Sequence, residues 1–338
     1  MTTDLVIRPA VEGDVNRIVD LLKICLGEGT IPREVRYWEW KHLHNPFGVS
    51  PVLLAEAGGQ LVGLRAFMRW AWMCRGRRVP VVRAVDTATH PDWRGKGLFT
   101  KLTLRLLDQV RSEGTAFVFN TPNRLSMPGY LKMGWRRVGK LAVWLRPLNP
   151  IRTLRSLVVR PANTNGADGI SPVGETIDAL VRAPGVEELT AHRDGEDRLT
   201  TARSTQYLSW RYGQIPGFQY RALWDMTRDA GAMVLFRTRN RGRLTELRLC
   251  EVLVGSGDES VRRCAGLVRE LLSSEKRANY ALAMATPGTE AAHVLAKAGF
   301  LRVQGIGPIL VARGLNETSC EPFHRSGWNV SIGDVEIF

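Results

Sequence analysis

The sequence has few of the features that mark disulfide-rich, metal-binding or membrane-spanning proteins. Its 338 residues include five cysteines, none in a Cys-x-x-Cys pair, and six histidines that do not cluster with them. We therefore expect neither a disulfide framework nor a metal site. No apolar run approaches the ~20 residues that span a bilayer, and the first residues lack a signal-peptide pattern. These absences predict a cytoplasmic protein that does not associate with membranes.

Lysine is scarce as well, since only eight of the 47 basic residues are lysine and the others are arginine. Such a skew often reflects the base composition of a genome. The net charge is nevertheless +14, and residues 1–150 alone contain 23 basic and 12 acidic residues. An excess of this size favours polyanionic partners, among them coenzyme A, RNA and an acidic carrier protein.

Two pairs of segments indicate that the chain contains two copies of one domain. Residues 120–138 resemble residues 285–303 at an offset of 165, and residues 37–46 resemble residues 207–216 at an offset of 170. Repeats of this kind predict a duplicated architecture. The expected parts are a first copy at 1–147, a linker at 148–185, a second copy at 186–312 and a docking tail at 313–338. Since fused copies satisfy the pairing that single-copy relatives achieve as dimers, we expect a monomer.

Periodicity in the first copy predicts an α/β domain with a mixed sheet. The expected order is β-α-α-β-β-β-α-β-α-β. The clearest helix is expected at 98–114, where a set of apolar residues recurs at helical spacing. The residues expected to face inward are Leu102, Leu104, Leu106, Leu107 and Val110.

The segment HPDWRGKG, residues 90–97, joins a predicted strand to that helix. Gly95 and Gly97 allow the backbone to turn its amides toward one point. The free amides and positive dipole end of the helix add to this, and Arg94 and Lys96 supply charge. The segment therefore predicts an anion site of a size that suits a pyrophosphate.

Two motifs in this half resemble the GNAT acyltransferase superfamily. Pro91, Arg94 and Gly97 match the family's loop, although the bulky Phe99 stands where the family has Gly or Ala. A second family segment is matched by Asn123, Tyr130, Lys132, Gly134 and Trp135. The resemblance covers the whole first copy. The second copy has lost these marks, since it carries Glu259, Ser260, Arg262, Gly288 and Leu295 at the corresponding positions. We interpret it as degenerate, either structural or shaping the acceptor site.

The resemblance implies acyl transfer from a thioester, usually acetyl-CoA or another acyl-CoA, to an amine. It implies that Tyr130 protonates the leaving thiolate. It also places the donor along the strand end and the loop, with these residues expected to bind it: Ala88, Thr89, His90, Arg94, Gly95, Lys96, Gly97, Leu98 and Asn123. Asp86 is the candidate base, since an apolar surrounding would raise its pKa. The alternative for Asp86 is a pair with Arg83 or a turn cap.

The leading hypothesis is thus an N-acyltransferase that acts on the primary amine of a small molecule by direct attack through a tetrahedral intermediate. An alternative keeps the fold and changes the donor to an aminoacyl-tRNA or an acidic acyl-carrier protein, which the charge of the first half would suit. A third hypothesis is a non-enzymatic module that binds coenzyme A or RNA. The sequence does not identify the acceptor, whose pocket we expect around residues 27–40.

Overall fold

The chain forms two compact units, each with its own sheet and its own apolar core. The computed structural model describes all residues except 1–3, 28–30, 150–170, 192–196, 228–230 and 336–338. Unit 1 comprises Met1–Gly139, Ile309–Gly327 and Ile337–Phe338, and unit 2 comprises Lys140–Pro308 and Trp328–Glu336. Most of the predicted linker, residues 150–170, lies outside the described residues.

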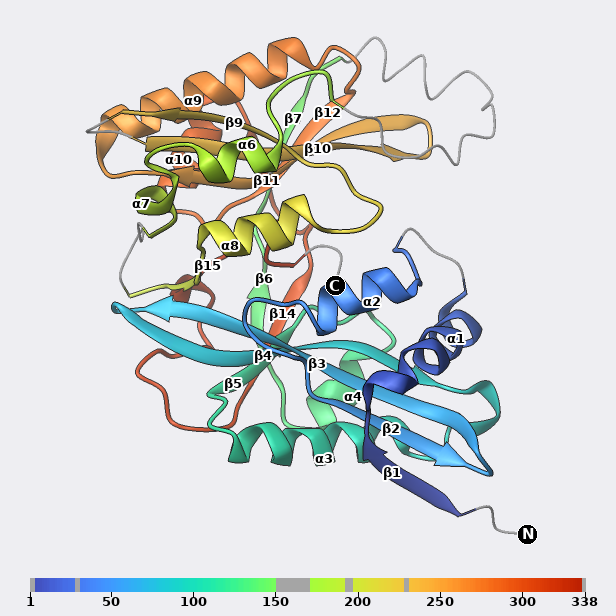
Figure 1. Ribbon diagram of the computed structural model, residues 1–338. Helices are drawn as coiled ribbons and strands as arrows, with labels where there is room; N and C mark the ends of the chain where they lie inside the picture. The colour runs from blue at the N-terminus through green and yellow to red at the C-terminus, as the bar shows by residue number, and fades with distance from the viewer. Residues whose placement is uncertain (1–3, 28–30, 150–170, 192–196, 228–230, 336–338) are drawn as a thin grey trace. The chain divides into compact units, whose positions relative to one another are not determined.

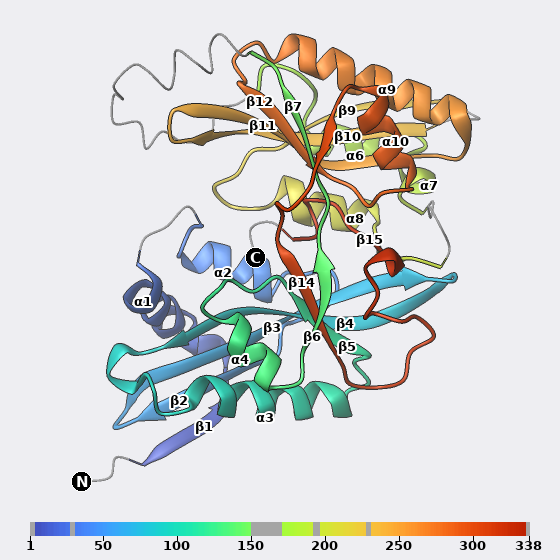
Figure 2. The same cartoon turned by 180° about the vertical axis from the view of Figure 1, so that it is seen from behind.

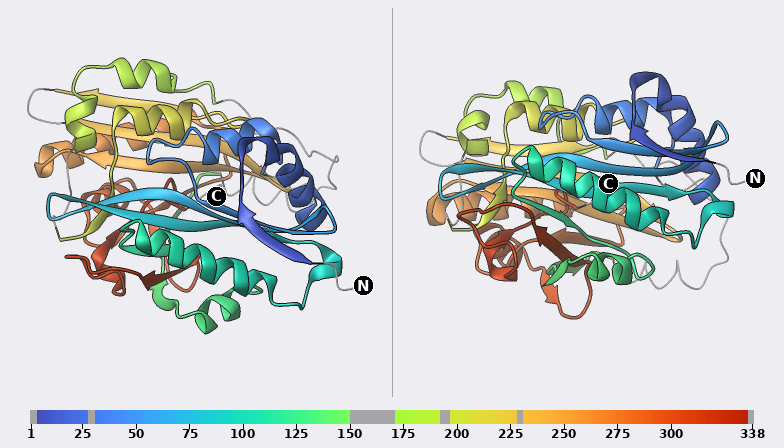
Figure 3. Two further views of the ribbon diagram at one scale, coloured as in Figure 1. Left: turned by 60° about the horizontal axis from the view of Figure 1, so that its bottom comes forward. Right: turned by 90° about the horizontal axis from the view of Figure 1, so that it is seen from below.

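The sheet of unit 1 runs in the order β1-β2-β3-β4-β5-β14-β6 (Figure 1). β1 to β4 are antiparallel neighbours, and β5 is parallel to β4. The helices α1 and α2 lie along one face of this sheet and α3 along the other (Figure 3). The strands are β1 (Leu5–Pro9), β2 (Val52–Ala57), β3 (Gln60–Cys74), β4 (Arg77–Thr89), β5 (Phe117–Asn120), β6 (Arg136–Lys140) and β14 (Ile309–Gly314). The helices are α1 (Val15–Leu26), α2 (Val35–His42), α3 (Leu98–Ser112) and α4 (Met127–Lys132).

Four of the five residues that we expected on the inward face of α3 lie in the core of unit 1. Leu102, Leu106, Leu107 and Val110 are buried against β2, β3 and β4. Leu104 is 39% exposed, so its predicted inward position is wrong. It stands two residues from both Leu102 and Leu106, and residues two apart lie on different sides of a helix.

The sheet of unit 2 runs in the order β13-β7-β12-β11-β10-β9. β9, β10 and β11 are antiparallel neighbours, β12 is parallel to β11, and α9 and α10 supply the apolar core. The strands of this sheet are β7 (Val143–Pro147), β9 (Arg221–Met226), β10 (Gly231–Arg241), β11 (Leu244–Val254), β12 (Tyr280–Met284) and β13 (Leu301–Val303). Unit 2 also contains the short strands β8 (Leu199–Thr201) and β15 (Trp328–Asn329), which pair with each other in parallel. The helices are α6 (Ile177–Arg182), α7 (Val186–Ala191), α8 (Thr205–Leu208), which continues as a π-helical turn at Ser209–Gly213, α9 (Gly257–Ser274) and α10 (Glu290–Lys297).

Two strands are exchanged between the halves of the sequence. β7 pairs with β12 and β13 in the sheet of unit 2, whereas β14 lies between β5 and β6 in unit 1 (Figure 2). The predicted boundaries at 147 and 312 would place each strand in the other unit. The division of the chain at these two boundaries stays a prediction, but the pairings of β7 and β14 differ from it. The sequence of a strand does not specify which sheet edge the strand joins, so these pairings could not be predicted.

Unit 1 contains a disulfide between Cys74, at the end of β3, and Cys320, whose Cα atoms are 6.5 Å apart. The expectation that the cysteines form no disulfide is therefore wrong for this pair. The two residues are 246 positions apart, so spacing along the chain gives no sign of their proximity. Cys25, Cys250 and Cys264 lie outside this disulfide and are thiols. No described helix is both long and apolar enough to cross a membrane.

Candidate functional site

A β-bulge in β4 shapes the site in unit 1. Arg65 of β3 pairs with Thr87 and Phe67 pairs with Ala84, so Val85 and Asp86 together face one residue of β3. An extra residue of this kind bends the strand and redirects its side chains. The described pairing of β4 with β5 is limited to Val82–Val118 and Arg83–Phe119, so the two strands share no described pairing beyond Arg83. The bulge and the open strand edge leave room for a cavity.

The cavity has a volume of about 300 Å³, which lies at the small end of ligand pockets. Its walls come from α1, α2, the bulge of β4, the end of β5 and α4. Most of the lining is apolar, and a few polar groups converge on the bulge, as is usual in small-molecule sites. The lining residues that carry the argument are Trp38, Lys41, Asp86, Asn123 and Tyr130. The predicted catalytic pair, Asp86 and Tyr130, therefore lines one cavity.

Asp86 is held by two neighbouring residues at the end of α2. Lys41 Nζ lies 2.6 Å and His42 Nε2 2.8 Å from the same carboxylate oxygen, Oδ2. The side chains of Lys41 and His42 are 3% and 1% exposed, whereas that of Asp86 is 22% exposed. The His42 ring stacks near Trp38 at 4.0 Å, and no described group hydrogen-bonds to its Nδ1. This arrangement makes a compact charged cluster on the wall of the cavity.

The cluster reverses the expected electrostatics of Asp86. Burial alone would raise its pKa, but the charge of Lys41 and the hydrogen bond from His42 outweigh burial and hold the pKa well below its ordinary value. The expectation of a raised pKa is therefore wrong, and so is the alternative pair with Arg83. Burial also lowers the pKa of Lys41 and of His42, although Asp86 opposes both shifts. Asp86 therefore stays ionised to low pH, and both Lys41 and His42 lose their protons more readily than the same side chains do when exposed.

Tyr130 reaches the cavity from α4 and is 3% exposed. Its hydroxyl oxygen accepts a hydrogen bond from Nη2 of the fully buried Arg65 at 2.9 Å. Arg65 Nη1 donates to the carbonyl oxygen of Val85 in the bulge at 3.0 Å. Since the hydroxyl oxygen is occupied by a donor, its own proton remains available to another group.

Phe99, the departure from the family loop, belongs to the core. Its ring packs edge-on against Tyr130 at 5.5 Å, and a Cβ added at Gly129 would lie 2.9 Å from its Cε1. Phe99 therefore fills the space between α3 and α4, where a glycine on α4 makes room for it. The bulky side chain does not exclude an anion from the backbone of the loop.

The loop itself has the backbone of an anion cradle. Gly95 and Gly97 have φ values of 75° and 76°, and a Cβ at either position would meet nothing within 4 Å. Gly97 caps the first turn of α3. Lys96 Nζ lies 4.4 Å from the ring centre of Trp93, and Arg94 donates weakly to the carbonyl oxygen of Cys25. Among the described residues, no carboxylate pairs with either cation.

The other predicted cofactor residues are divided between strand, loop and pocket. Ala88 and Thr89 pair with β3 through Leu64 and Gly63, and His90 caps the turn that follows β4. The side chain of Leu98 is buried in the core, so only its amide is available to a ligand. Asn123 lines the cavity, but its Oδ1 already accepts from the amides of residues 125 and 126.

Sequence reasoning missed Lys41, His42 and Arg65 as site residues. Arg65 carried a signal, because it interrupts the apolar run of β3 with a charge. Lys41 and His42 are the last two residues of α2, a helix with two tryptophans, and belong to no motif. No group of three or more His, Cys, Asp or Glu side chains that could hold a metal occurs among the described residues.

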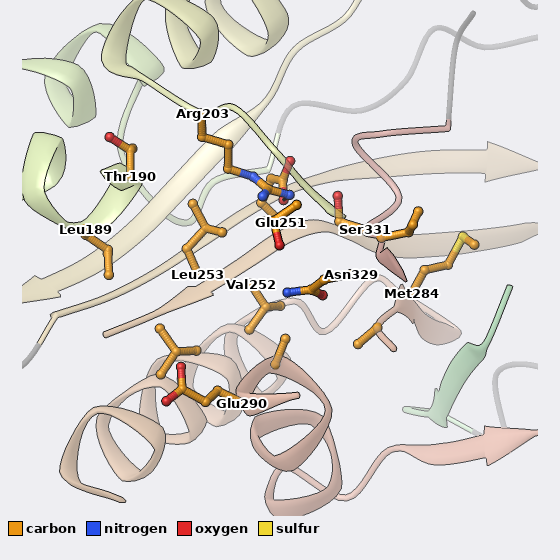
Figure 4. Close-up of a pocket in the computed structure, with 15 residues that line it drawn as sticks. Leu189, Thr190, Arg203, Glu251, Val252, Leu253, Met284, Glu290, Asn329 and Ser331 are labelled. Atoms are coloured by element: carbon orange, nitrogen blue, oxygen red, sulfur yellow. Dashed lines mark hydrogen bonds and ion pairs between the residues drawn. The ribbon is translucent and has the colours of Figure 1, made fainter. Parts of the chain in front are cut away.

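Unit 2 has a bulge at the same place in its sheet. Leu235 pairs with Glu251 and Phe236 with Leu249, so Cys250 is the extra residue. Glu251 is fully buried, accepts from Tyr212 at 2.7 Å and pairs with Arg203 at 2.9 Å. Figure 4 shows Arg203 beside Glu251, and both residues line a cavity of about 50 Å³. Unit 2 therefore has a closed polar cluster where unit 1 has an open pocket.

Comparisons with known proteins agree with this geometry. Residues 6–138 match the model of a family described as an acetyltransferase (GNAT) domain. No curated protein gives a significant match. Among solved structures, a GCN5-related N-acetyltransferase from Anabaena variabilis has a TM-score of 0.65 at 14% identity, covering 93% of this chain and 73% of its own. Eis1 from Mycobacterium abscessus has a TM-score of 0.58 at 17% identity, with 93% and 74% covered. At these identities the structures show the fold, and the predicted α/β fold with mixed sheets is confirmed.

Proposed function

We propose that the chain, whose residues 6–138 match a GNAT acetyltransferase domain, is an acyltransferase that moves an acyl group from an acyl-CoA to the primary amine of a small molecule. One observation carries the proposal. Asp86 and Tyr130 line a single cavity of about 300 Å³ beside the open edge of β4. This cavity holds both an ionised cluster and a hydroxyl where donor and acceptor would meet.

The donor's pyrophosphate would lie on the loop at residues 90–97. Gly95 and Gly97 have positive φ values there, the first turn of α3 has free amides, and Arg94 and Lys96 add positive charge. The acyl end would follow the unpaired edge of β4 past Ala88 toward the cavity. A backbone amide of that edge is suited to hold the carbonyl oxygen as it gains negative charge.

The chemistry requires one proton to leave the amine and one to reach the sulfur. The amine nitrogen attacks the thioester carbon, a tetrahedral intermediate forms, and the carbon–sulfur bond breaks. We assign the amine's proton to Lys41, because burial lowers the pKa of this pocket-lining group, and the ammonium that forms is stabilised by Asp86 at 2.6 Å. Tyr130 gives its hydroxyl proton to the leaving thiolate. Asp86 thus acts as a charge partner and not as the base.

Calorimetric titration of nucleic-acid-free protein with acetyl-CoA tests the donor. We expect micromolar binding that the substitution Gly97→Glu abolishes, because a carboxylate would stand at the anion cradle. Gly242→Glu is the matched control, since Gly242 also has a positive φ, 59°, and open space around its Cβ position, but lies in unit 2. Free coenzyme A released in the presence of an amine panel then measures transfer. Absence of acetyl-CoA binding would refute the proposal.

The charge of the first half favours one alternative donor. Residues 1–150 contain 23 basic and 12 acidic residues, an excess that suits the phosphates of an aminoacyl-tRNA or the acidic face of an acyl-carrier protein. Binding to such a donor would weaken steeply with salt, whereas acetyl-CoA would not bind. The tandem arrangement is part of the same proposal, with unit 2 as the copy that has lost its site.

A further inference from the structure

Arg65 is a buried cation without a counter-charge. It is fully buried in β3, and no described carboxylate pairs with it. Its Nη1 and Nη2 donate to Val85 and Tyr130, and no described group hydrogen-bonds to its Nε. A charge in the protein interior is costly unless it is paired. The presence of the arginine is therefore not explained by an ion pair among the described residues.

Aromatic rings surround the guanidinium. Its central carbon lies 4.8 Å from the ring centre of Phe67, 5.5 Å from that of Tyr130 and 5.6 Å from that of Phe99. Such contacts lower the cost of a buried cation without neutralising it. The positive charge therefore remains directed at the hydroxyl of Tyr130, to which Nη2 donates.

Unit 2 shows what the same fold position contains where this pair is absent. Counted from the bulge, Arg65 and Phe67 of β3 correspond to Val234 and Phe236 of β10. The counterpart of Tyr130 is Leu295 on α10. Val234 and Leu295 are fully buried in the core of unit 2. The arginine and the tyrosine are thus both replaced by apolar residues, while the phenylalanine is kept.

We propose that Arg65 is a positioning residue for Tyr130 in acyl transfer, an inference that rests on the proposed function. By donating to the hydroxyl oxygen, Arg65 directs the hydroxyl proton away from itself and toward the departing sulfur. When Tyr130 gives up that proton, the phenolate oxygen remains in contact with the guanidinium. The thiolate becomes a thiol, and solvent returns the proton to Tyr130 before the next turnover.

Three variants test the role: Arg65→Met, Tyr130→Phe and the double variant Arg65→Val/Tyr130→Leu, which copies unit 2. We expect each to lower kcat with acetyl-CoA roughly 100-fold, the usual contribution of a general acid. The KM for acetyl-CoA should stay the same, because Arg65 touches no part of the donor. The melting temperature of Arg65→Met should stay close to that of the wild type, because the loss of an unpaired buried charge offsets the loss of the two hydrogen bonds to Val85 and Tyr130.

The leaving group separates positioning from a structural role. With an aryl thioacetate as donor, whose thiolate departs without a proton, Arg65→Met should regain most of the wild-type rate. Arg65→Lys should restore part of kcat with acetyl-CoA, because lysine supplies one of the two donated hydrogen bonds. Arg237→Met is the matched control, since Arg237 of β10 is 3% exposed and lies 5.1 Å from the ring centre of Phe218 in unit 2. It should leave kcat unchanged.

The outcomes distinguish this inference from the proposed function. If the wild type transfers acyl groups and Arg65→Met does so equally well, the positioning role is wrong. The role is also wrong if Arg65→Met melts well below the wild type and is equally slow with both donors, since that pattern indicates a structural residue. If the wild type releases no coenzyme A with any amine, the proposed function fails, and the inference fails with it.

Discussion

The cluster of Lys41, His42 and Asp86 makes the substitution Asp86→Asn a quantitative test of the site. The carboxylate oxygen Oδ2 meets Lys41 Nζ at 2.6 Å and His42 Nε2 at 2.8 Å. An amide in its place leaves the ammonium of Lys41, which is 3% exposed, without a counter-charge. The variant therefore creates an unpaired charge inside unit 1 while its volume changes little.

Breaking a buried ion pair from one side costs about 3–5 kcal/mol. The Asp86 side chain is 22% exposed, so we take the lower end, about 3 kcal/mol. For a domain of this size that corresponds to a fall of roughly 6–12 °C in the melting temperature of unit 1. The difference from wild type should be constant from about pH 5 up to the lowered pKa of Lys41, above which the lysine is neutral and the ion pair is lost. It should shrink as the pH falls below about 4, because the pKa of Asp86 is lowered and its contribution is lost only on protonation.

Differential scanning calorimetry of the single variants and the double variant Lys41→Met/Asp86→Asn completes the test. Because the double variant removes both charges, it should be more stable than Asp86→Asn alone. Asp108→Asn is the control, since its side chain is 77% exposed and lies 4.0 Å from Arg111, and such pairs contribute little. A fall of less than 2 °C for Asp86→Asn, or a double variant no more stable than it, would refute the buried pair.

Three further predictions concern the base, the loop and the disulfide. If Lys41 takes the amine's proton, kcat/KM should rise as the pH passes the lowered pKa of Lys41 and should reach a plateau below pH 10.5. The pH–rate profile of Lys41→Met should lack this rise. Phe99→Ala should lower the free energy of unfolding by about 3 kcal/mol, because the ring packs on Tyr130; chemical denaturation measures this. The affinity for acetyl-CoA, measured by calorimetric titration, should be unchanged. Cys74→Ser opens the link to Cys320 across 246 positions, and denaturation should show a loss of roughly 3–5 kcal/mol.

The local features of the fold were predictable because they depend on local patterns. Apolar spacing identifies the long helix at 98–114, and glycines followed by a helix identify the anion cradle. The same method wrongly predicted an inward position for Leu104, because residues spaced by two cannot all face one side of a helix. The exchange of β7 and β14 was beyond this method, because either strand satisfies the pattern in either sheet.

The site was predictable in its residues but not in its electrostatics. Asp86 and Tyr130 were identified and line one cavity, yet the pKa of Asp86 moves opposite to the expected direction. The cause is the arrival of Lys41 and His42 from α2, more than 40 positions away along the sequence. Arg65 was visible as a charge in an apolar strand, but its partner Tyr130 lies 65 positions away. Partners brought together by tertiary structure decide the chemistry, and a single sequence does not show them.

The bulges of the two units place carboxylates in different surroundings. Glu251 is fully buried, and its partners are Tyr212 and Arg203, whose guanidinium keeps its charge at any working pH. Asp86 is partly exposed, and its partners are a lysine and a histidine. Burial lowers the pKa of both. In unit 2 the carboxylate at the bulge thus has a permanently charged partner and a cavity of only about 50 Å³. Titratable partners beside a cavity of about 300 Å³ are what proton transfer needs, so we assign the reaction to unit 1.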